Sequence, residues 1–360
     1  MEQYWVWLSS VEGIGPARFY QLIGAYGDPR NVWDNAGDVG MKFLGTATLR
    51  KLKDARSERY FYELFNRIEK CGMRTVTRES AGYPQRLQHI YDPPPVLYVL
   101  GECDLNAERS FAIVGSRRCT RDGQRAAREM AETLAREDVT IVSGMAYGID
   151  AAAHEGALIG MGRTIAVLGC GADVIYPRQH EELYHRILDN GGAAVSEFTP
   201  GTEPRPGNFP SRNRIISGMS EGVLIVEGAE RSGAMITVNL AADQNRDVFA
   251  VPGSIYSPLS AAPNRLIVEG AMPTLSGWDI LEHYRWAARP DARQSMPHNK
   301  IDLSPEDKQI VKPLTEQELS FDELANLVDF PIAKLNSHLT MLELRGIIVK
   351  APGGLYRAYQ

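Results

Sequence analysis

The chain has 360 residues, 44% of them hydrophobic, so it exceeds one typical domain of about 100 to 200 residues and can bury a sizeable core. Its net charge of −6 argues against a protein that coats nucleic acid by bulk attraction, although a local basic patch can still steer a polyanion. The four cysteines form no CxxC pair, and no signal sequence or membrane-spanning apolar run is recognisable. We therefore expect a reduced, cytoplasmic protein without membrane contact.

Residues 1–75 predict a small helical domain. The stretches "RFYQLIGAYG" and "RYFYELFNRIEK" place apolar residues at helical spacing, and glycine and proline interrupt the pattern at Gly13, Gly15, Pro16 and Pro29. Two interpretations of "GIGPAR" stay open. It can bind phosphate as the hairpin of a helix-hairpin-helix domain does, or it can be a plain break between helices.

Residues 76–285 predict an α/β domain with a doubly wound sheet. Short apolar runs alternate with helical stretches, and buried parallel strands read as such continuous runs because helices cover both sheet faces. The expected strands lie in six segments: "FAIVGSR", "VTIVSGMA", "TIAVLGCG", "AAVSEF", "GVLIVEGA" and "DVFAVPGS".

The remaining chain predicts a linker and a third domain. Residues 286–303, "WAARPDARQSMPHNKIDL", are polar and punctuated by prolines, which is typical of a linker. Residues 304–360 then give a helix, a break at Pro331, a second amphipathic helix and two short strands around a Pro-Gly-Gly turn. That order predicts a winged-helix domain.

The turn after the first strand of the α/β domain predicts a phosphate site. In "AIVGSRRCTRDGQ" it contains Gly115, Ser116 and Arg117, at the carboxyl end of a parallel strand. Gly115 allows close backbone approach, and we expect the following helix to offer unpaired N–H groups to an anion. Neither GxGxxG nor GxxxxGK[ST] is present. An alternative is a solvated helix face, since five arginines follow within twelve residues: Arg117, Arg118, Arg121, Arg125 and Arg128.

A second stretch, "FPSRNRIISG", predicts a site for single-stranded nucleic acid. It supplies a ring, two guanidiniums and an amide: Phe209, Arg212, Asn213 and Arg214. Guanidiniums bind phosphate oxygens, and an aromatic face can stack a base with about 1–3 kcal/mol at stake. In the alternative interpretation Phe209 belongs to the core, and Arg212 pairs with Glu197 or Glu227 to brace the fold. A third turn, "EGAERSGAMIT", places Ser232 and Gly233 before another helix, where N–H groups can hold an oxyanion.

The sequence predicts no catalytic machinery, no metal site and no cofactor. Asp150 and His154 lie four residues apart on an expected helix, where a structural hydrogen bond is commoner than acid/base catalysis. His180 and His185 lie five apart and do not share the helix face that HExxH uses for zinc. No GxSxG motif occurs, and no cysteine has an evident histidine partner.

From Tyr83 to Ala271 the chain resembles the DprA family, also called Smf, of bacterial DNA-processing proteins. The resemblance rests on nine motifs: "YPQRLQHIYDPPPVLYVLG", "IVGSRRCT", "VSGMAYGIDAAAH", "TIAVLGCGADVIYP", "SEFTPG", "FPSRNRIISGMS", "VEGAERSGAMIT", "VFAVPG" and "NRLIVEGA". More loosely, "VEGIGPARFYQLIGAYGD" is similar to the amino-terminal helical domain of the family, a SAM-like or helix-hairpin-helix-like fold. The last sixty residues resemble its winged-helix domain.

The resemblance implies an extended Rossmann fold that forms a homodimer, binds single-stranded DNA and loads the recombinase RecA in natural transformation (competence) or another DNA recombination task. It implies DNA contacts at these positions: Gly115, Ser116, Arg117, Phe209, Arg212, Asn213, Arg214, Ser232, Gly233 and Thr237. Phe209 is the expected base-stacking ring. One departure is Pro206, where some members carry a lysine; Arg205 is the nearest substitute.

The last domain carries more acidic than basic residues. From residue 301 onward nine acids face six cations, whereas a recognition helix bound to phosphate should be basic. We therefore expect the winged-helix domain to contact protein, or to contact DNA weakly.

One alternative function is that of a nucleotide-cleaving phosphoribohydrolase, but the PGGxGTxxE segment of those enzymes has no counterpart glutamate in "EGAERSGAMIT". Another is an adaptor that works through its terminal domains, which leaves the arginine-rich turns unexplained.

Overall fold

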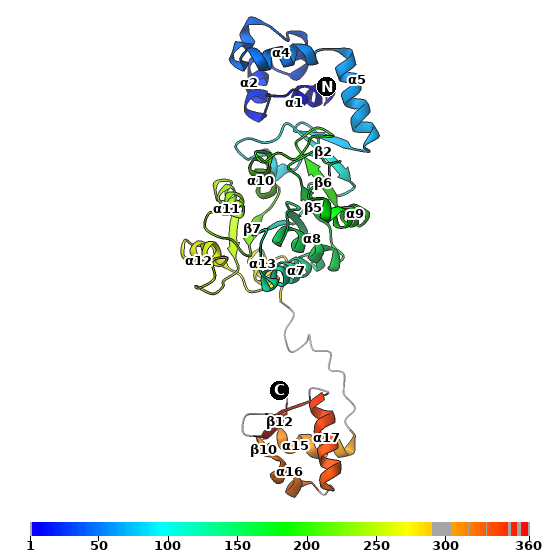
Figure 1. The fold of residues 1–360 in the computed structure, drawn as a ribbon, viewed down its shortest axis with the longest axis vertical. Coiled ribbons are helices and arrows are strands. Elements are labelled where there is room, and N and C mark those ends of the chain that lie inside the picture. The colour runs from blue at the N-terminus through cyan, green and yellow to red at the C-terminus, as the bar shows by residue number, and fades with distance from the viewer. Residues whose placement is uncertain are drawn as a thin grey trace. The chain divides into compact units, whose positions relative to one another are not determined.

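The structure is a computed structural model of the chain (Figure 1). It describes residues 2–289, 304–315, 317–328, 330–344, 347–350 and 354–358. The chain divides into two compact units, Met1–Arg289 and Pro290–Gln360. Residues 290–303, which form most of the predicted linker, lie outside the described residues.

The first part of the first unit is helical, as the apolar spacing predicts. Its helices are α1 Glu2–Ser10, α2 Pro16–Tyr26, α3 Pro29–Asp34, the 3-10 helix η1 Val39–Leu44, α4 Thr46–Ala55 and α5 Glu58–Lys70. Their apolar faces form a core around Trp7, Phe19 and Leu22, and Tyr98 of the following sheet belongs to the same core. The helical domain therefore packs against one side of the sheet through a shared apolar layer.

Among the described residues of the first unit, nine strands form one sheet. They are β1 Arg74–Thr77, β2 Val96–Gly101, β3 Ser110–Val114, β4 Thr140–Ser143, β5 Thr164–Val167, β6 Ala193–Ser196, β7 Gly222–Ile225, β8 Asp247–Ala250 and β9 Met272–Pro273. The six apolar runs predicted as strands are β3 to β8, so this part of the prediction is confirmed. The prediction misses β1, β2 and β9. β9 has two residues and offers no periodic signal, whereas the apolar run of β2 could have been found by the same criterion.

The order of the strands creates a crevice near the middle of the sheet. The order is β1-β2-β6-β5-β4-β3-β7-β8-β9. β2 pairs antiparallel with β1 and β6, and the other neighbouring pairs are parallel. From β3 the chain builds β4, β5 and β6 on one side and then returns to add β7 on the other side. At such a reversal the turns after the two central strands diverge, and a ligand crevice opens at their carboxyl ends.

Helices cover both faces of this sheet (Figure 1). They are α6 Gln85–Gln88, α7 Arg121–Arg136, α8 Ile149–Ile159, the 3-10 helix η2 Arg178–His180, α9 Glu181–Asp189, α10 Asn208–Gly218, α11 Gly233–Asp243, α12 Ala261–Val268 and α13 Gly277–His283. On β3, Phe111 and Ile113 face the core shared with α7, α8 and α13. Ala112 and Val114 face the opposite core, shared with α10, α11 and α12. The doubly wound, Rossmann-like α/β fold is thus confirmed.

The second unit is a winged-helix domain. Its described elements are α15 Pro305–Leu314, β10 Leu319–Ser320, α16 Phe321–Leu327, α17 Ile332–Leu344, β11 Ile348–Lys350 and β12 Leu355–Ala358. Pro331 lies between α16 and α17, as predicted, and the strands form a small antiparallel sheet in the order β10-β12-β11. Leu324, Leu335 and Tyr356 belong to its separate core.

Candidate nucleic-acid interface

A cavity of about 590 Å³ lies at the carboxyl ends of β3 and β7, where the sheet topology places the ligand crevice. Nine of the ten predicted site residues line it: Gly115, Ser116, Arg117, Phe209, Arg212, Asn213, Ser232, Gly233 and Thr237. Pro206, the departure from the family pattern, lines it too. Asp150 and Tyr176 also line it, although the sequence analysis did not place them there. Arg117, Arg212 and Ser232, from three separate segments, therefore meet at one cavity.

The turn after β3 is tightly packed against the turn after β7. A Cβ added to Gly115 would lie 2.6 Å from a side-chain carbon of Ile149 and 2.9 Å from the backbone oxygen of Glu227. The Ser116 amide donates to that Glu227 oxygen (2.7 Å), and the Ser116 hydroxyl oxygen accepts from the Arg118 amide (3.1 Å). Gly115 is thus required for packing of the two turns, and the exposed side chains of Arg117 and Arg118, which both line the cavity, can reach a ligand.

The amino terminus of α7 is partly capped, because Thr120 accepts from one amide of the first helical turn and the Glu227 carboxylate lies beside it. The Thr120 amide and hydroxyl donate to the two carboxylate oxygens of Glu227, at 2.8 and 2.6 Å. The Thr120 hydroxyl oxygen in turn accepts from the Gly123 amide (2.9 Å). The Glu227 carboxylate occupies the position that an external anion would take at this helix end.

The amino terminus of α11 opens toward the cavity without a side-chain cap. Ser232 is the residue before the first helical turn, but its side chain caps no backbone amide. Its buried hydroxyl oxygen has no hydrogen-bond partner among the described residues. Gly233 is exposed, and the buried Thr237 lines the same cavity one turn later. This helix end combines uncapped amides with an unpaired hydroxyl, which suits an anion.

Phe209 is half-buried at the start of α10, on the wall of the cavity and outside the apolar cores. The Arg117 guanidinium carbon lies 5.6 Å from the centre of its ring, in a cation–π contact. Tyr176 packs against the ring with a centroid distance of 5.5 Å. A Cβ on Gly169 would lie 2.9 Å from the ring edge, so a glycine is needed beneath it. The core interpretation of Phe209 is therefore wrong.

Arg212 is buried and braces the ends of two strands. Its Nη1 donates to the backbone oxygens of Gly144 (2.7 Å) and Val167, and its Nε has no hydrogen-bond partner among the described residues. Burial lowers the pKa of Arg212 to about 10, although the nearby Asp150 carboxylate opposes the shift. Arg212 thus forms a cationic floor for the cavity. The neighbouring Asn213 donates to the Gly233 backbone oxygen at 3.4 Å, which links α10 to the α11 terminus.

Arg214 is the one predicted site residue that does not line the cavity. Its side chain is 6% exposed and pairs with Asp92 (Nε to Oδ2, 2.9 Å) and Glu197 (Nη2 to Oε2, 2.6 Å). The bracing ion pair with Glu197 that was considered for Arg212 is therefore made by Arg214, two residues later. Burial raises the pKa of Glu197, which the Arg214 charge opposes, so this pair is a desolvated structural contact.

Asp150 and His154 do not form a catalytic pair. His154 is fully buried, and its Nδ1 lies 2.7 Å from the Thr164 hydroxyl oxygen. Burial lowers the pKa of His154 to about 3, so the ring is neutral at physiological pH. Asp150 accepts from the Ala146 amide (3.4 Å), and burial raises its pKa against the opposing charges of Arg212 and Arg117. Both side chains serve the fold around the cavity.

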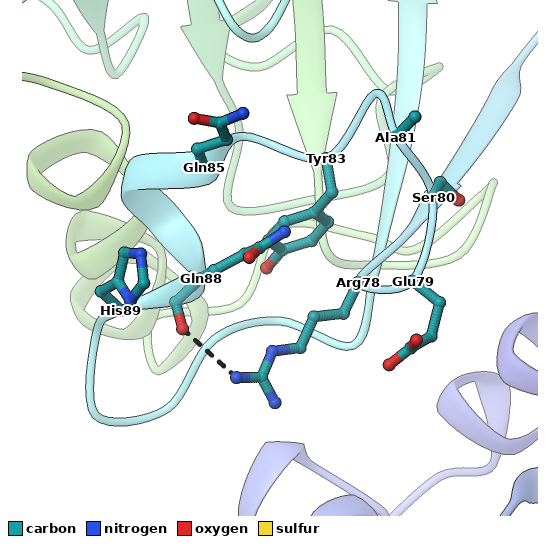
Figure 2. Close-up of a pocket in the computed structure, with 8 residues that line it drawn as sticks. All are labelled: Arg78, Glu79, Ser80, Ala81, Tyr83, Gln85, Gln88 and His89. Carbon is teal, nitrogen blue, oxygen red and sulfur yellow. Dashed lines mark hydrogen bonds between the residues drawn. The ribbon is translucent and has the colours of Figure 1, made fainter.

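A larger cavity, of about 750 Å³, lies between β1 and α6 (Figure 2). Its lining comes from one continuous stretch, residues 78–89, and not from converging strand ends. In Figure 2 the Arg78 side chain lies beside Glu79 and donates to the Gln88 backbone oxygen (3.3 Å). The Tyr83 hydroxyl donates to the Pro94 backbone oxygen (2.8 Å). This cavity offers one arginine beside an acid, whereas the crevice between β3 and β7 is lined by Arg117, Arg118 and Arg212 against the single acid Asp150 in its described lining, so the crevice is the better site for a polyanion.

Within the described ranges, no group of three or more histidine, cysteine or acidic side chains is arranged to hold a metal ion. Among the helices that the structure describes, none combines the length and apolarity that crossing a bilayer requires.

The family models and the relatives that match this chain agree on one protein family. A family model described as "DNA recombination-mediator protein A" matches residues 74–285, and one described as "DprA winged helix domain" matches residues 294–354. Protein Smf of Escherichia coli is 41% identical over 301 residues, which cover 81% of this chain and 79% of that protein.

Two solved structures resemble this one. The X-ray structure of DNA processing protein A (DprA) from Streptococcus pneumoniae has a TM-score of 0.67 and 32% sequence identity, covering 78% of this chain and 98% of that one. DNA processing protein A from Helicobacter pylori, reported for its single-stranded DNA binding mode, has a TM-score of 0.54 and 28% identity, covering 60% of this chain and 97% of that one.

Proposed function

This chain belongs to the family of DNA recombination-mediator protein A, known as DprA or Smf, and from that premise we propose that it binds single-stranded DNA in the cavity between β3 and β7. One observation carries the proposal: Arg117, Arg212 and Ser232 converge on this cavity, and Arg117 has no ion-pair partner among the described residues. The similar Helicobacter pylori protein, which binds single-stranded DNA, supports it.

Each group in the cavity has a distinct proposed role. The Arg117 guanidinium and the α11 terminus at Ser232 and Gly233 bind phosphate oxygens, because both present N–H donors to the cavity. Phe209 stacks a base, while Arg212 supplies positive potential from below. Gly115, Ser116, Asn213 and Thr237 shape the cavity walls, and Arg214 contributes by holding α10 in place.

We further propose that the protein is a cytoplasmic homodimer that loads RecA onto single-stranded DNA during natural transformation or recombination. The family resemblance supports this function. Exposed apolar side chains of the first unit, among them Ile255, Tyr256 and Val268, offer surface for protein contacts. The proposed domains are residues 1–75, 76–285 and 304–360 with a linker at 286–303; the first family model ends at residue 285, and the second begins at residue 294, within the proposed linker.

We also propose that the protein is not an enzyme. The cavity offers a buried Asp150 and cationic binding groups, and the neighbouring His154 is committed to Thr164. Incubation with nucleoside monophosphates should release no free base. Release of base would revive the phosphoribohydrolase alternative.

The Arg117→Ala variant tests DNA binding. We expect its affinity for oligothymidine to fall about tenfold, because one charge-assisted phosphate contact is lost. The slope of log affinity against log salt should shrink by about 0.7, since one fewer counterion is displaced from a single strand. Fluorescence anisotropy over a salt series measures both the affinity and the slope.

The matched control is Arg125→Ala, which removes an exposed arginine of α7 that pairs with Asp122 and does not line the cavity. Equal affinity and slope in the two variants would contradict the proposal.

A further inference from the structure

We propose that Tyr176 is a second base-stacking residue, and that the DNA strand leaves Phe209 across Tyr176 toward Tyr147. This inference rests on the proposed function and adds to it the direction of the strand along the sheet edge. Tyr176 lines the cavity directly, and its ring contacts Phe209.

The first argument is the accessibility of the rings. Phe209 is half-buried, with the Arg117 guanidinium over its ring, Tyr176 against it and Gly169 beneath its edge. Tyr176 is 44% exposed whereas Phe209 is half-buried, so more of the Tyr176 side chain is open to a base. Stacking requires a free aromatic face and tolerates any base. A strand bound at Arg117 therefore meets the ring of Tyr176 next to that of Phe209.

The second argument is that a further exposed ring follows on the adjacent strand end. Tyr147, in the turn after β4, is 41% exposed. Its ring packs edge-on against His180 at 5.0 Å, and its hydroxyl donates to the Gln179 side chain. The His180 Nδ1 lies 3.0 Å from the Met145 backbone oxygen, so the turns after β4 and β5 are tied together. Because β4 and β5 are neighbouring strands, the rings of Tyr176 and Tyr147 belong to adjacent turns of one sheet edge.

Charge bounds this track at its far end. Arg178 is exposed and lies between Tyr176 and His180 in the chain, where it can meet a phosphate. Glu181 and Glu182 are exposed at the start of α9 and place two negative charges just beyond His180. A DNA strand is repelled there, so the track crosses toward Tyr147 and does not continue along α9.

A path of the DNA strand away from Tyr176, toward Arg205 and the helical domain, is less favourable for stacking. There a cleft of about 310 Å³ runs from Arg205 and Asn208 to the hairpin of residues 9–16 in the helical domain. The Glu12 carboxylate lines this cleft, and it is paired with Lys51 (2.8 Å). Phe198, the aromatic residue in its lining, is half-buried. The cleft thus offers Arg205 as a cation but no comparable exposed ring.

Photocrosslinking tests the direction. Oligothymidines of about ten nucleotides, with 5-iododeoxyuridine at successive positions, are irradiated on the full-length protein, and the crosslinked residues are mapped by mass spectrometry. We expect crosslinks at Tyr176, and at Tyr147 from a position further along the strand. Crosslinks confined to Phe209, or to Phe209 and residues 9–16, would overturn the inference.

Affinity measurements separate stacking from mere support of Phe209. Tyr176→Ala should weaken binding about tenfold, and Tyr176→Phe should retain it, since the ring is kept. In a Phe209→Ala background, measured at low salt where affinity is highest, Tyr176→Ala should still weaken binding several-fold. No effect there would show that Tyr176 acts only through Phe209 and would overturn the inference. Tyr62→Ala removes a more exposed ring, on α5 and outside the cavity lining, and should change nothing.

The two proposals fail in different ways. If the wild type does not bind oligothymidine, or if Arg117→Ala binds as well as wild type, the proposed function is wrong. If Arg117→Ala weakens binding but Tyr176 neither crosslinks nor contributes in the Phe209→Ala background, only the direction of the strand is wrong.

Discussion

The strand-end cavity and helix α17 of the winged-helix domain both carry cations, but they differ in what faces those cations. In the cavity, Arg117 lies over an aromatic ring and has no ion-pair partner in the described part of the chain. On α17, the Lys334 Nζ lies 2.6 Å from the Glu306 Oε1. A cation that the fold already neutralises contributes little to the binding of a polyanion. The presence of carboxylate partners therefore says more about DNA binding than the number of basic residues does.

Helix α10 also carries an arginine that the fold neutralises, Arg214, which lies outside the cavity lining and pairs with Asp92 and Glu197. We expect Arg214→Ala to have the largest effect on stability, lowering the free energy of unfolding by about 3–5 kcal/mol, because Glu197 would stay buried without its partner. Urea unfolding followed by tryptophan fluorescence measures this, since all five tryptophans lie within residues 1–289.

The control for this prediction is Arg59→Ala. Arg59 pairs with Glu63 on the exposed surface of α5, and the loss of such a pair changes stability by at most about 1 kcal/mol. If the two variants were equally stable, Arg214 would not be a structural cation, and a direct role in DNA binding would have to be reconsidered.

Two histidines also differ in what faces them, and the pH dependence of stability tests the environment of His154. His338 lies beside Asp307, whereas His154 faces the Thr164 hydroxyl in the core. Burial lowers the pKa of His154 from 6.5 to about 3, so below pH 6.5 the unfolded chain binds a proton that the folded chain does not. Stability is therefore expected to fall as the pH drops, with a contribution from His154 of about 3 kcal/mol between pH 6.5 and about pH 4.

His154→Gln is the variant that isolates this contribution. Burial raises the pKa of Asp150 and of Glu197, so these carboxyl groups also contribute to the pH dependence, and the informative quantity is the difference in pH slope between wild type and variant. The variant should lose less stability on acidification. Identical slopes in urea unfolding series would show that His154 does not have a depressed pKa in the fold.

The features that could be predicted from the sequence are those that local sequence patterns determine. The strands β3 to β8 were predicted because burial on both faces leaves a continuous apolar run, as Ala112 and Ile113 on opposite faces of β3 illustrate. The turn residues Gly115, Ser232 and Gly233 were predicted because parallel strands bring their carboxyl ends to one edge, where the structure indeed assembles them.

The features of the site that the sequence did not predict depend on contacts between residues far apart in the chain. Arg212 and Arg214 are equivalent in a sequence motif, yet one meets the backbone oxygen of Gly144 and the other meets the carboxylate of Glu197. Glu227 follows β7, and nothing local indicates that its carboxylate caps α7 through Thr120. Tyr176 could have been considered from its place in the turn after β5, but its contact with Phe209 is tertiary.

The smallest effect is expected at the winged-helix domain. Lys334→Gln removes a charge that Glu306 already compensates, so affinity of the full chain for oligothymidine should stay within about twofold of wild type. Lys334→Glu adds a like charge beside Glu306 and should show the same affinity if α17 does not contact DNA. Anisotropy titrations under the conditions used for Arg117→Ala measure both variants. A loss for Lys334→Gln comparable with that of Arg117→Ala would mean that DNA displaces Glu306 from Lys334. An internal ion pair would then be no obstacle to phosphate binding, and the distinction between the two regions would fail.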